Sequence, residues 1–212
     1  MSKIGQSDQA NHEYDLSSFW TAVGHGEMPA VSFLKAAAYQ DAHPGNSDPV
    51  DEQDFVVDTI NKLQQSPDWK STAVVIAYDD SDGWYDHQMS PILVHSGDAT
   101  TDALSGAGQC GTVRTTGAGK AIDQNPDRCG YGPRLPLLVI SPYAKKNFVD
   151  HTLTDQSSVL RFIEDNWGTG QIGSGSMDAL AGPITNMFDF THPQFGQVLL
   201  NKDTGQVVRG HR

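Results

Sequence analysis

Thr72-Ala-Val-Val-Ile-Ala-Tyr78 is a continuous run of mainly apolar, β-branched residues, and Leu135-Pro-Leu-Leu-Val-Ile140 is a second one. In neither run do apolar and polar residues alternate. Continuous runs of this length are typical of strands that are buried on both faces of a parallel sheet. The two runs therefore predict two buried strands of an α/β fold.

A predicted amphipathic helix precedes the first run. Within residues 51–65, Val56, Ile60 and Leu63 recur at helical spacing, and Pro67 ends the pattern. The other elements that we expect are a helix at residues 16–23, a strand at residues 29–35, a helix that Asp155 caps and Gly168 ends, and a hairpin near residues 197–208. Helices that alternate with buried strands favour an α/β class with an open sheet and flanking helices.

The amino-acid composition argues against nucleic-acid binding and against insertion into a membrane. The 212 residues include 14 Lys and Arg against 26 Asp and Glu, a formal net charge of −12. Because binding to a phosphate backbone needs clustered cations, we expect no nucleic-acid partner. No apolar run approaches the roughly 20 residues that cross a bilayer, so we expect no transmembrane segment. The polar first residues have no secretory signal pattern.

Carboxylates gather directly after the first run, in Asp79-Asp80-Ser81-Asp82-Gly83-Trp84-Tyr85-Asp86-His87. Ligands of open α/β sheets collect at the carboxyl ends of the strands, and adjacent carboxylates repel one another unless a cation is present. Oxygen ligands favour Ca²⁺, Mg²⁺ or Mn²⁺, and an added imidazole extends the choice to Zn or Fe. A solvated acidic turn around Asp82 and Gly83 is the alternative. An EF-hand is excluded because no acidic residue follows Asp86 through Gly97.

His43 is the candidate catalytic histidine. It lies in a turn-rich loop after the predicted strand at residues 29–35, and a parallel sheet would bring that loop to the same edge as Asp79. An imidazole there can bind a metal, donate a hydrogen bond to a phosphoryl group or protonate a leaving oxygen. The alternative is a histidine in a surface loop with no role in catalysis.

Cys110 and Cys129 are the two cysteines of the chain and lie 19 positions apart in a segment rich in Gly, Thr and Asp. A disulfide that closed a loop of this size would stabilise the fold by about 3 kcal/mol. The spacing alone is equally compatible with two separate thiols.

Several motifs, taken in order, resemble the bacterial phosphoesterase family. They are His43-Pro44, Asp51-Glu-Gln53, Tyr78-Asp-Asp-Ser-Asp-Gly-Trp-Tyr-Asp-His87, Cys129-Gly-Tyr-Gly-Pro-Arg-Leu-Pro-Leu-Leu-Val-Ile-Ser-Pro-Tyr-Ala-Lys145, Val149-Asp-His-Thr152 and Ser158-Val-Leu-Arg-Phe-Ile-Glu164. The family contains phospholipases C of the non-haemolytic type and acid phosphatases, and it belongs to the alkaline phosphatase superfamily. The resemblance extends over residues 14–190.

The resemblance implies roles for the matching positions. Asp79 and Asp80 are similar to the paired metal-binding carboxylates of the family, and His43 is similar to its active-site histidine. Asp86 and His87 belong to the segment that follows and are expected to support the site. The implied cofactor is a divalent metal ion of unknown identity, and the implied substrate is a phosphate ester or a phospholipid.

The resemblance also carries expectations about the whole chain. It implies one phosphoesterase-type domain over residues 1–212, formed from the C-terminal part of an alkaline-phosphatase-like open sheet and incomplete on its N-terminal side. We expect the family nucleophile to come from a separate N-terminal half or from another protomer. A periplasmic or secreted location is implied, and this favours a Cys110–Cys129 disulfide. The alternative function is a catalytically inactive fragment that only folds or binds metal or phosphate.

Overall fold

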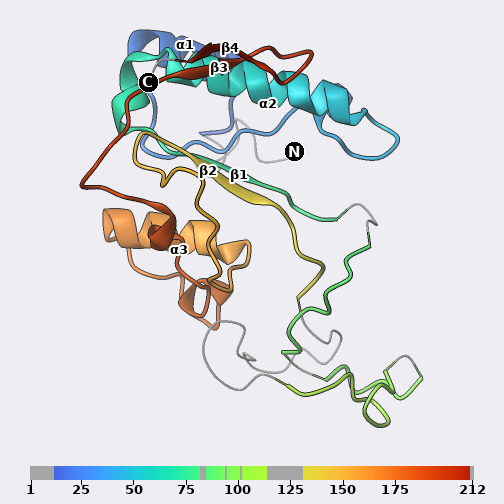
Figure 1. The fold of residues 1–212 in the computed structure, drawn as a ribbon. Coiled ribbons are helices and arrows are strands. Elements are labelled where there is room, and N and C mark those ends of the chain that lie inside the picture. The colour runs from blue at the N-terminus through green and yellow to red at the C-terminus, as the bar shows by residue number, and fades with distance from the viewer. Residues whose placement is uncertain (1–11, 82–84, 94, 101, 114–130, 211–212) are drawn as a thin grey trace. The chain divides into compact units, whose positions relative to one another are not determined.

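The computed structural model describes residues 12–81, 85–93, 95–100, 102–113 and 131–210 (Figure 1). The chain divides into two compact units, which we call unit 1 (Met1–Ala73 with Gln194–Arg212) and unit 2 (Val74–Pro193). Among the described residues, no helix combines the length and the apolar character that a membrane span requires.

Unit 1 contains the first two helices and a C-terminal hairpin. Its elements are α1 (Leu16–His25), α2 (Pro49–Gln64), β3 (Val198–Leu200), β4 (Val207–Gly210) and the short 3₁₀-helices η2 (Ala38–Gln40) and η3 (Pro67–Ser71). The predicted helices at residues 16–23 and 51–65 and the predicted hairpin are confirmed.

Helix α2 begins at a complete capping box. The carboxylate of Asp48 accepts hydrogen bonds from the backbone N–H groups of Val50 (2.8 Å) and Asp51 (3.1 Å). In return, the carboxylate of Asp51 accepts one from the backbone N–H of Asp48, and Pro49 occupies the first turn. These bonds satisfy N–H groups that a helix start leaves without intrahelical partners.

The hairpin lies along α2, as Figure 1 shows. Side-chain amides of the helix take the place of a neighbouring strand. Gln64 donates to the carbonyl oxygen of Val198 and accepts from its N–H, both at 2.8 Å. Asn61 makes the same pair of bonds to Leu200, at 2.8 and 3.0 Å. The edge of β3 is thereby paired within unit 1.

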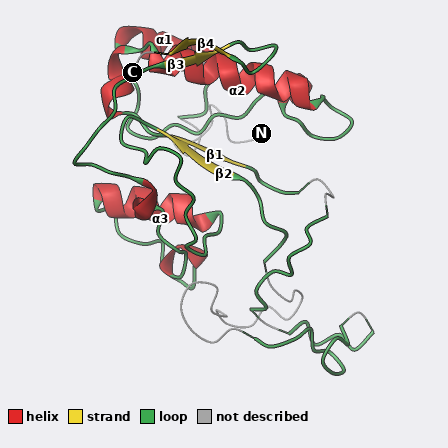
Figure 2. Cartoon of the chain, in the orientation of Figure 1, coloured by secondary structure: helices red, strands yellow, loops and turns green. Residues whose placement is uncertain are grey.

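Unit 2 contains β1 (Val74–Ala77), β2 (Leu137–Ile140), α3 (Ser157–Trp167) and the short 3₁₀-helices η4 (Met177–Ala179) and η5 (Thr185–Met187). Much of the remaining described chain is loop (Figure 2). Asp155 accepts a hydrogen bond from the N–H of Ser157 at 2.7 Å, and Gly168 ends α3 with φ +64°. The predicted C-terminal glycine is confirmed, whereas Gln156, and not Asp155, stands directly before the first residue of α3.

The packed core of unit 2 lies beside α3. Ala181, Ile184 and Phe188 are buried. The ring of Phe162, on α3, stacks on the ring of Phe188 with a centroid distance of 5.0 Å. This apolar contact joins the helix to the segment that follows it.

The pairing of the two apolar runs corrects one expectation. β1 and β2 are neighbours, but they are antiparallel, with Val74 opposite Ile140 and Ala77 opposite Leu137. A parallel pair needs a crossover that carries the chain back across the sheet. The segment between these strands instead returns to the end at which β1 stops, and its described part contains no helix. Neither strand is fully buried, and Leu138 is 47% exposed.

The expected strand at residues 29–35 is also wrong, because this segment is irregular. Pro29 has no N–H to donate, and Phe33 is 82% exposed. An extended segment becomes a strand only when another strand pairs with it. The sequence argument that a sheet edge brings the His43 loop close to Asp79 required this strand, so the structure does not support it.

The described residues combine helices with small antiparallel sheets, which is compatible with the α/β class. The alkaline-phosphatase-like open sheet stays a prediction.

Candidate functional site

The loop that carries His43 is arranged by the side chain of Asp41. One carboxylate oxygen of Asp41 accepts a hydrogen bond from the backbone N–H of His43 at 3.0 Å, and the other accepts one from the amide of Asn46 at 3.4 Å. The N–H of His43, with smaller contributions from Asn46 and Ser47, lowers the pKa of Asp41. Ala42 has φ +59°, an uncommon conformation for a residue with a side chain. The loop thus has a defined conformation at the candidate histidine.

The ring of His43 is oriented by the next residue. Its Nδ1 lies 2.8 Å from the carbonyl oxygen of Pro44. Because a carbonyl oxygen only accepts, this contact assigns the proton to Nδ1 and leaves the lone pair of the neutral ring on Nε2. The side chain is exposed. Nε2 is therefore the atom of His43 that can exchange a proton with a ligand.

Asp79 and Asp80 lie in a bend directly beyond β1, and both are exposed. The side-chain amide of Gln156, the residue before α3, donates to the backbone carbonyl oxygens of Tyr78 (3.1 Å) and Asp79 (2.6 Å). These bonds hold the backbone of the bend against α3. The predicted carboxylate pair is thus placed on a turn that a neighbouring helix supports.

Asp86 is held in a dense set of hydrogen bonds. Its two oxygens accept from Nε (2.9 Å) and Nη2 (2.7 Å) of Arg134, and it also accepts from the backbone N–H groups of Arg134 and Gln88. The guanidinium of Arg134 is the main reason that the pKa of Asp86 lies far below its ordinary value, and the bond from Gln88 adds to the effect. Asp86 therefore orients Arg134, and the four hydrogen bonds that its two oxygens accept occupy the lone pairs that a metal would need.

The register of the sheet places these groups at one end of unit 2. Ala77, the last residue of β1, is opposite Leu137, the first residue of β2. Asp79 and Asp80 follow the first of these residues, and Arg134 precedes the second. Both segments therefore leave the sheet from the same end. His43 belongs to unit 1, whereas the carboxylate pair belongs to unit 2.

The donor set of Asp79 and Asp80 fits a hard divalent cation. Two carboxylates suit Mg²⁺ or Mn²⁺, which commonly keep several waters and take further oxygens from a phosphate. Within the described part of the chain, no cluster of three or more His, Cys, Asp or Glu side chains could enclose an ion. The residues present thus fit an open metal site that substrate oxygens and other ligands complete.

Fewer contacts are described for the remaining predicted positions, His87 and Cys110. His87 is exposed, and its ring makes an edge contact with Tyr85 at a centroid distance of 5.0 Å. Cys110 is 5% exposed, and its N–H donates to Nδ1 of His95 at 3.3 Å. Cys129 lies outside the described residues, so the Cys110–Cys129 disulfide stays a prediction.

Two residues of this region were missed in the sequence. Gln156 makes its contacts to positions nearly eighty residues earlier, and no local pattern indicates such bonds. Arg134 could have been found, because it stands immediately before an apolar run whose partner strand ends in carboxylates. An isolated arginine at a strand terminus is a candidate partner for such carboxylates.

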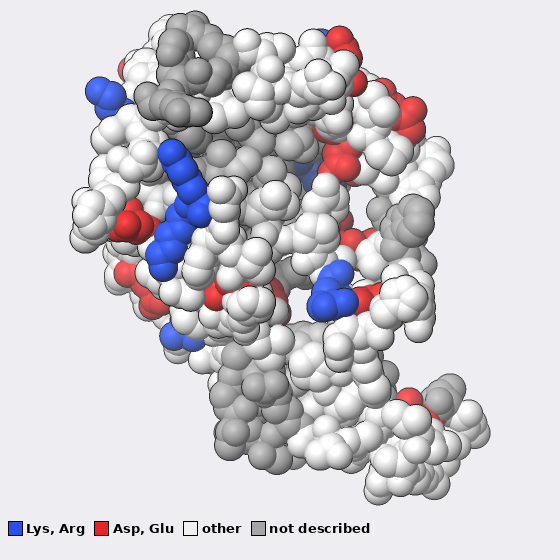
Figure 3. All heavy atoms as spheres, viewed as in Figure 1, with Lys and Arg blue, Asp and Glu red and all other residues white. Residues whose placement is uncertain are grey.

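Charged side chains on the face shown in Figure 3 occur in small groups among uncharged residues. No large area of one sign is visible on that face among the described residues. The candidate site is therefore described by the contacts of its individual residues and not by a charged surface patch.

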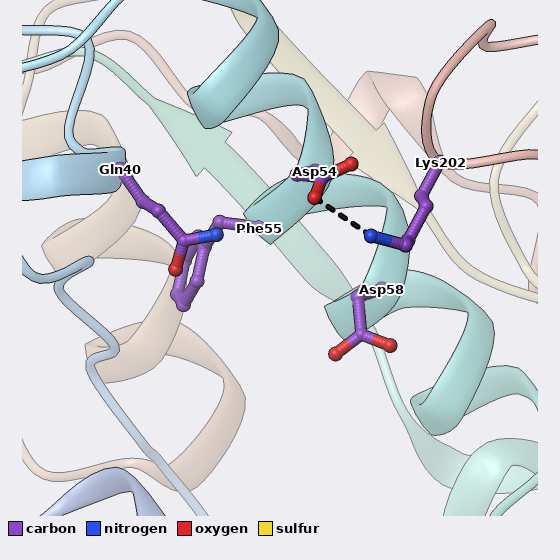
Figure 4. Close-up of a pocket in the computed structure, with 5 residues that line it drawn as sticks. All are labelled: Gln40, Asp54, Phe55, Asp58 and Lys202. Atoms are coloured by element: carbon purple, nitrogen blue, oxygen red, sulfur yellow. Dashed lines mark hydrogen bonds and ion pairs between the residues drawn. The ribbon is translucent and has the colours of Figure 1, made fainter.

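Unit 1 also contains a cavity of about 250 Å³ (Figure 4). Its lining residues are Gln40, Asp54, Phe55, Asp58 and Lys202. Lys202 points toward Asp54 and pairs with it at 2.8 Å, which raises the pKa of the lysine. None of the predicted site residues lines this cavity.

A family profile and several individual proteins are similar in sequence to this chain. The sequence profile of the Phosphoesterase family matches residues 1–170. A non-hemolytic phospholipase C of Pseudomonas aeruginosa is 31% identical over 169 residues, which are 78% of this chain and 24% of the relative. A non-hemolytic phospholipase C of Burkholderia pseudomallei is 31% identical over 178 residues, 81% of this chain and 24% of the relative.

Phospholipase C B of Mycobacterium tuberculosis is 28% identical over 178 residues, 82% of this chain and 32% of the relative. The chain thus spans about a quarter to a third of the length of these proteins. The profile match covers His43, Asp79, Asp80, Asp86 and Arg134. From this match and these relatives we conclude that the chain belongs to the phosphoesterase family.

Proposed function

We propose that the chain is part of a metal-dependent phosphoric-ester hydrolase and contributes the acidic metal ligands of its active site. The observation that carries this proposal is the pair Asp79 and Asp80 on the supported bend after β1, within the residues that match the family. The relatives named above are phospholipases C. Their names make a phospholipid or another phosphate ester the proposed substrate.

Asp79 and Asp80 would hold the divalent ion through their carboxylate oxygens. A bound ion supplies positive charge to the oxygens of a phosphoryl group during transfer. The two carboxylates are exposed and adjacent in sequence, so both can offer oxygens to the same ion. Metal affinity should therefore depend on both side chains.

His43 is proposed to exchange a proton at Nε2. Its Nδ1 is bonded to the carbonyl oxygen of Pro44, so the ring is oriented and only Nε2 remains for a ligand. A protonated Nε2 can donate to a phosphoryl oxygen or to the departing oxygen. The nucleophile and the rest of the site are proposed to come from a further segment or another protomer, and a periplasmic or secreted location is proposed for the assembled enzyme.

The second candidate is a catalytically inactive chain that folds and binds only metal or phosphate. It is favoured by the small ligand set, since the described residues contain no group of three metal-binding side chains. The two candidates share the metal site and differ in turnover.

The deciding experiment measures phosphomonoester and phosphodiester hydrolysis by the full chain with added Mg²⁺, Mn²⁺, Ca²⁺ or Zn²⁺. The assay also includes a segment that supplies the nucleophile, such as the N-terminal part of a related phospholipase C, because the proposal places the nucleophile outside this chain. With that segment we expect metal-dependent turnover, and we expect it to fall at least about a hundredfold in Asp79→Asn and Asp80→Asn. Asp165→Asn, at a side chain that is 64% exposed on α3, is the matched control and should keep full activity. Metal binding without turnover, even when that segment is present, would support the inactive chain, and turnover that survives both substitutions would contradict the assignment of Asp79 and Asp80.

A further inference from the structure

We infer that Arg134 binds a phosphoryl oxygen of the ligand and that Asp86 positions its guanidinium for this contact. The inference rests on the proposed function, because it adds a side chain to the same metal site. The observations behind it are the register of β1 with β2 and the hydrogen bonds between Asp86 and Arg134.

The position of Arg134 follows from the sheet. Because Ala77 is opposite Leu137, the segment that enters β2 leaves the sheet at the end where β1 finishes. Asp80 is three residues beyond Ala77, and Arg134 is three residues before Leu137. The guanidinium therefore belongs to the same end of unit 2 as the carboxylate pair.

The orientation of Arg134 follows from Asp86. Nε and Nη2 of Arg134 each donate one hydrogen bond to the carboxylate of Asp86, at 2.9 and 2.7 Å. The backbone N–H of Arg134 donates to the same carboxylate at 2.9 Å. A guanidinium has five N–H groups, so three of them point along the edges that Asp86 does not occupy. The Arg134 side chain is 71% exposed, whereas that of Asp86 is 13% exposed. A largely buried carboxylate thus anchors a cation whose other edge is accessible to a ligand.

The chemistry of that edge suits an oxyanion. Arginine binds carboxylate and phosphate through paired N–H donors, and a guanidinium held by one carboxylate loses less side-chain freedom when it binds a second anion. A divalent ion on Asp79 and Asp80 and the guanidinium of Arg134 would be two positively charged groups that contact one phosphoryl group. Lysine in place of Arg134 would keep the charge but lose the paired geometry.

The test uses the full chain, Mn²⁺ as the metal and inorganic phosphate as the probe. Mn²⁺ binding is measured by electron paramagnetic resonance, and phosphate binding by the broadening of its ³¹P resonance near the bound ion. In Arg134→Gln we expect unchanged Mn²⁺ affinity and a loss of phosphate affinity of about ten- to a hundredfold. Arg134→Lys should recover part of this loss, and Asp86→Asn should weaken phosphate binding by about threefold or more.

Lys146→Gln is the control for a lost positive charge, because Lys146 lies beyond the other end of β2. It should change phosphate affinity by less than about twofold. Circular dichroism of each variant establishes that it is folded, and Arg134→Lys provides the test if Arg134→Gln does not fold.

The outcomes separate the two proposals. Normal Mn²⁺ binding with equal phosphate affinity in wild type and Arg134→Gln would overturn the role of Arg134 and leave the metal site intact. Absence of phosphate binding by the Mn²⁺-loaded wild type would also overturn it. Absence of Mn²⁺ binding, or Mn²⁺ binding that Asp79→Asn and Asp80→Asn leave unchanged, would overturn the proposed function itself.

Discussion

Gly182 shows how a single residue constrains unit 2. A Cβ atom at this position would overlap the backbone carbonyl oxygen of Leu153 and lie 3.2 Å from a methyl group of Thr152. Ala181, its neighbour, is fully buried. The backbone of this region has no space to move aside without disturbing the core.

We therefore expect Gly182→Ala to lower the free energy of unfolding by about 2 kcal/mol or more, measured by denaturant titration. Gly24→Ala is the control, because Gly24 lies within α1 with no atom within 4 Å of the added Cβ. This change should stabilise the chain by about 0.5–1 kcal/mol through helix propensity. Equal effects of the two substitutions would show that the close approach at Gly182 is relieved easily.

Glu164 and Asp178 form a buried pair of acidic side chains between α3 and η4, at 6% and 0% exposure. Burial and the adjacent carboxylate of Asp178 raise the pKa of Glu164 above its ordinary value. Ser176 and the N–H of Ile172 lower the pKa of Asp178. The pair thus favours a protonated Glu164 beside an ionised Asp178.

The sign of the pH effect follows from the raised pKa of Glu164. The native chain holds this proton more tightly than the unfolded chain, so the pair contributes stability at low pH that is lost as pH rises through the raised value. Glu164→Gln should therefore melt at a higher temperature than wild type at pH 7, and this advantage should shrink toward pH 4. Asp165→Asn, at an exposed position of α3, should show no such trend, and a constant advantage of Glu164→Gln would contradict the protonated state.

At the scale of elements, the contact between α2 and β3 depends on amide side chains. Gln64 is 5% exposed and satisfies both backbone groups of Val198. Gln64→Leu would leave this N–H and carbonyl without their partners. We expect a loss of about 1–3 kcal/mol in the free energy of unfolding.

Gln65→Leu is the matched control because Gln65 is exposed and its amide bonds only within the helix, to the carbonyl oxygen of Asn61, among the described contacts. It should change the free energy of unfolding by less than about 0.5 kcal/mol. Hydrogen exchange at Val198 and Leu200 gives a local readout, and it should accelerate in Gln64→Leu alone. Unchanged exchange would show that α2 is not needed to protect this strand.

The start of α2 provides a second element-scale prediction. Asp48→Ala removes the acceptor for the N–H groups of Val50 and Asp51, and we expect a loss of about 1 kcal/mol by denaturant titration. Asp48→Asn keeps an oxygen acceptor and should lose much less. Similar losses in the two variants would indicate that the charge at position 48, rather than the cap itself, stabilises the helix start.

At the scale of the whole molecule, a bound metal should raise stability by mass action. At a Mn²⁺ concentration one hundred times its Kd, the free energy of unfolding of the unit that contains Asp79 and Asp80 should rise by about 2.7 kcal/mol. The double variant Asp79→Asn, Asp80→Asn should lose this increase. Calorimetry at constant ionic strength measures it.

The chain carries a net charge of −12, so weak ion binding elsewhere needs its own control. Asp165→Asn combined with Asp203→Asn removes two charges at side chains that are 64% and 73% exposed. This variant should keep the full increase. An equal loss in both double variants would mean that Mn²⁺ acts through general screening.

The sequence by itself determined the three α-helices, the two apolar strands, the C-terminal hairpin and the family. Helical spacing and the terminal Gly168 predict helices because these patterns act between residues close in the chain. The matching motifs, including Asp79 and Asp80, are likewise contiguous and readable without a structure. Two apolar runs were correctly identified as strands for the same reason.

Only the tertiary structure decided how these pieces meet. It paired β1 with β2 in antiparallel order, left residues 29–35 without a strand partner, and joined Asp86 to Arg134 across 48 positions. A strand run specifies that a segment is extended and apolar, but its direction relative to a partner depends on the path of the chain between them. Hydrogen bonds between distant residues depend on that path as well, which is why the pairing of Asp86 with Arg134 and the contacts of Gln156 became known only from the structure.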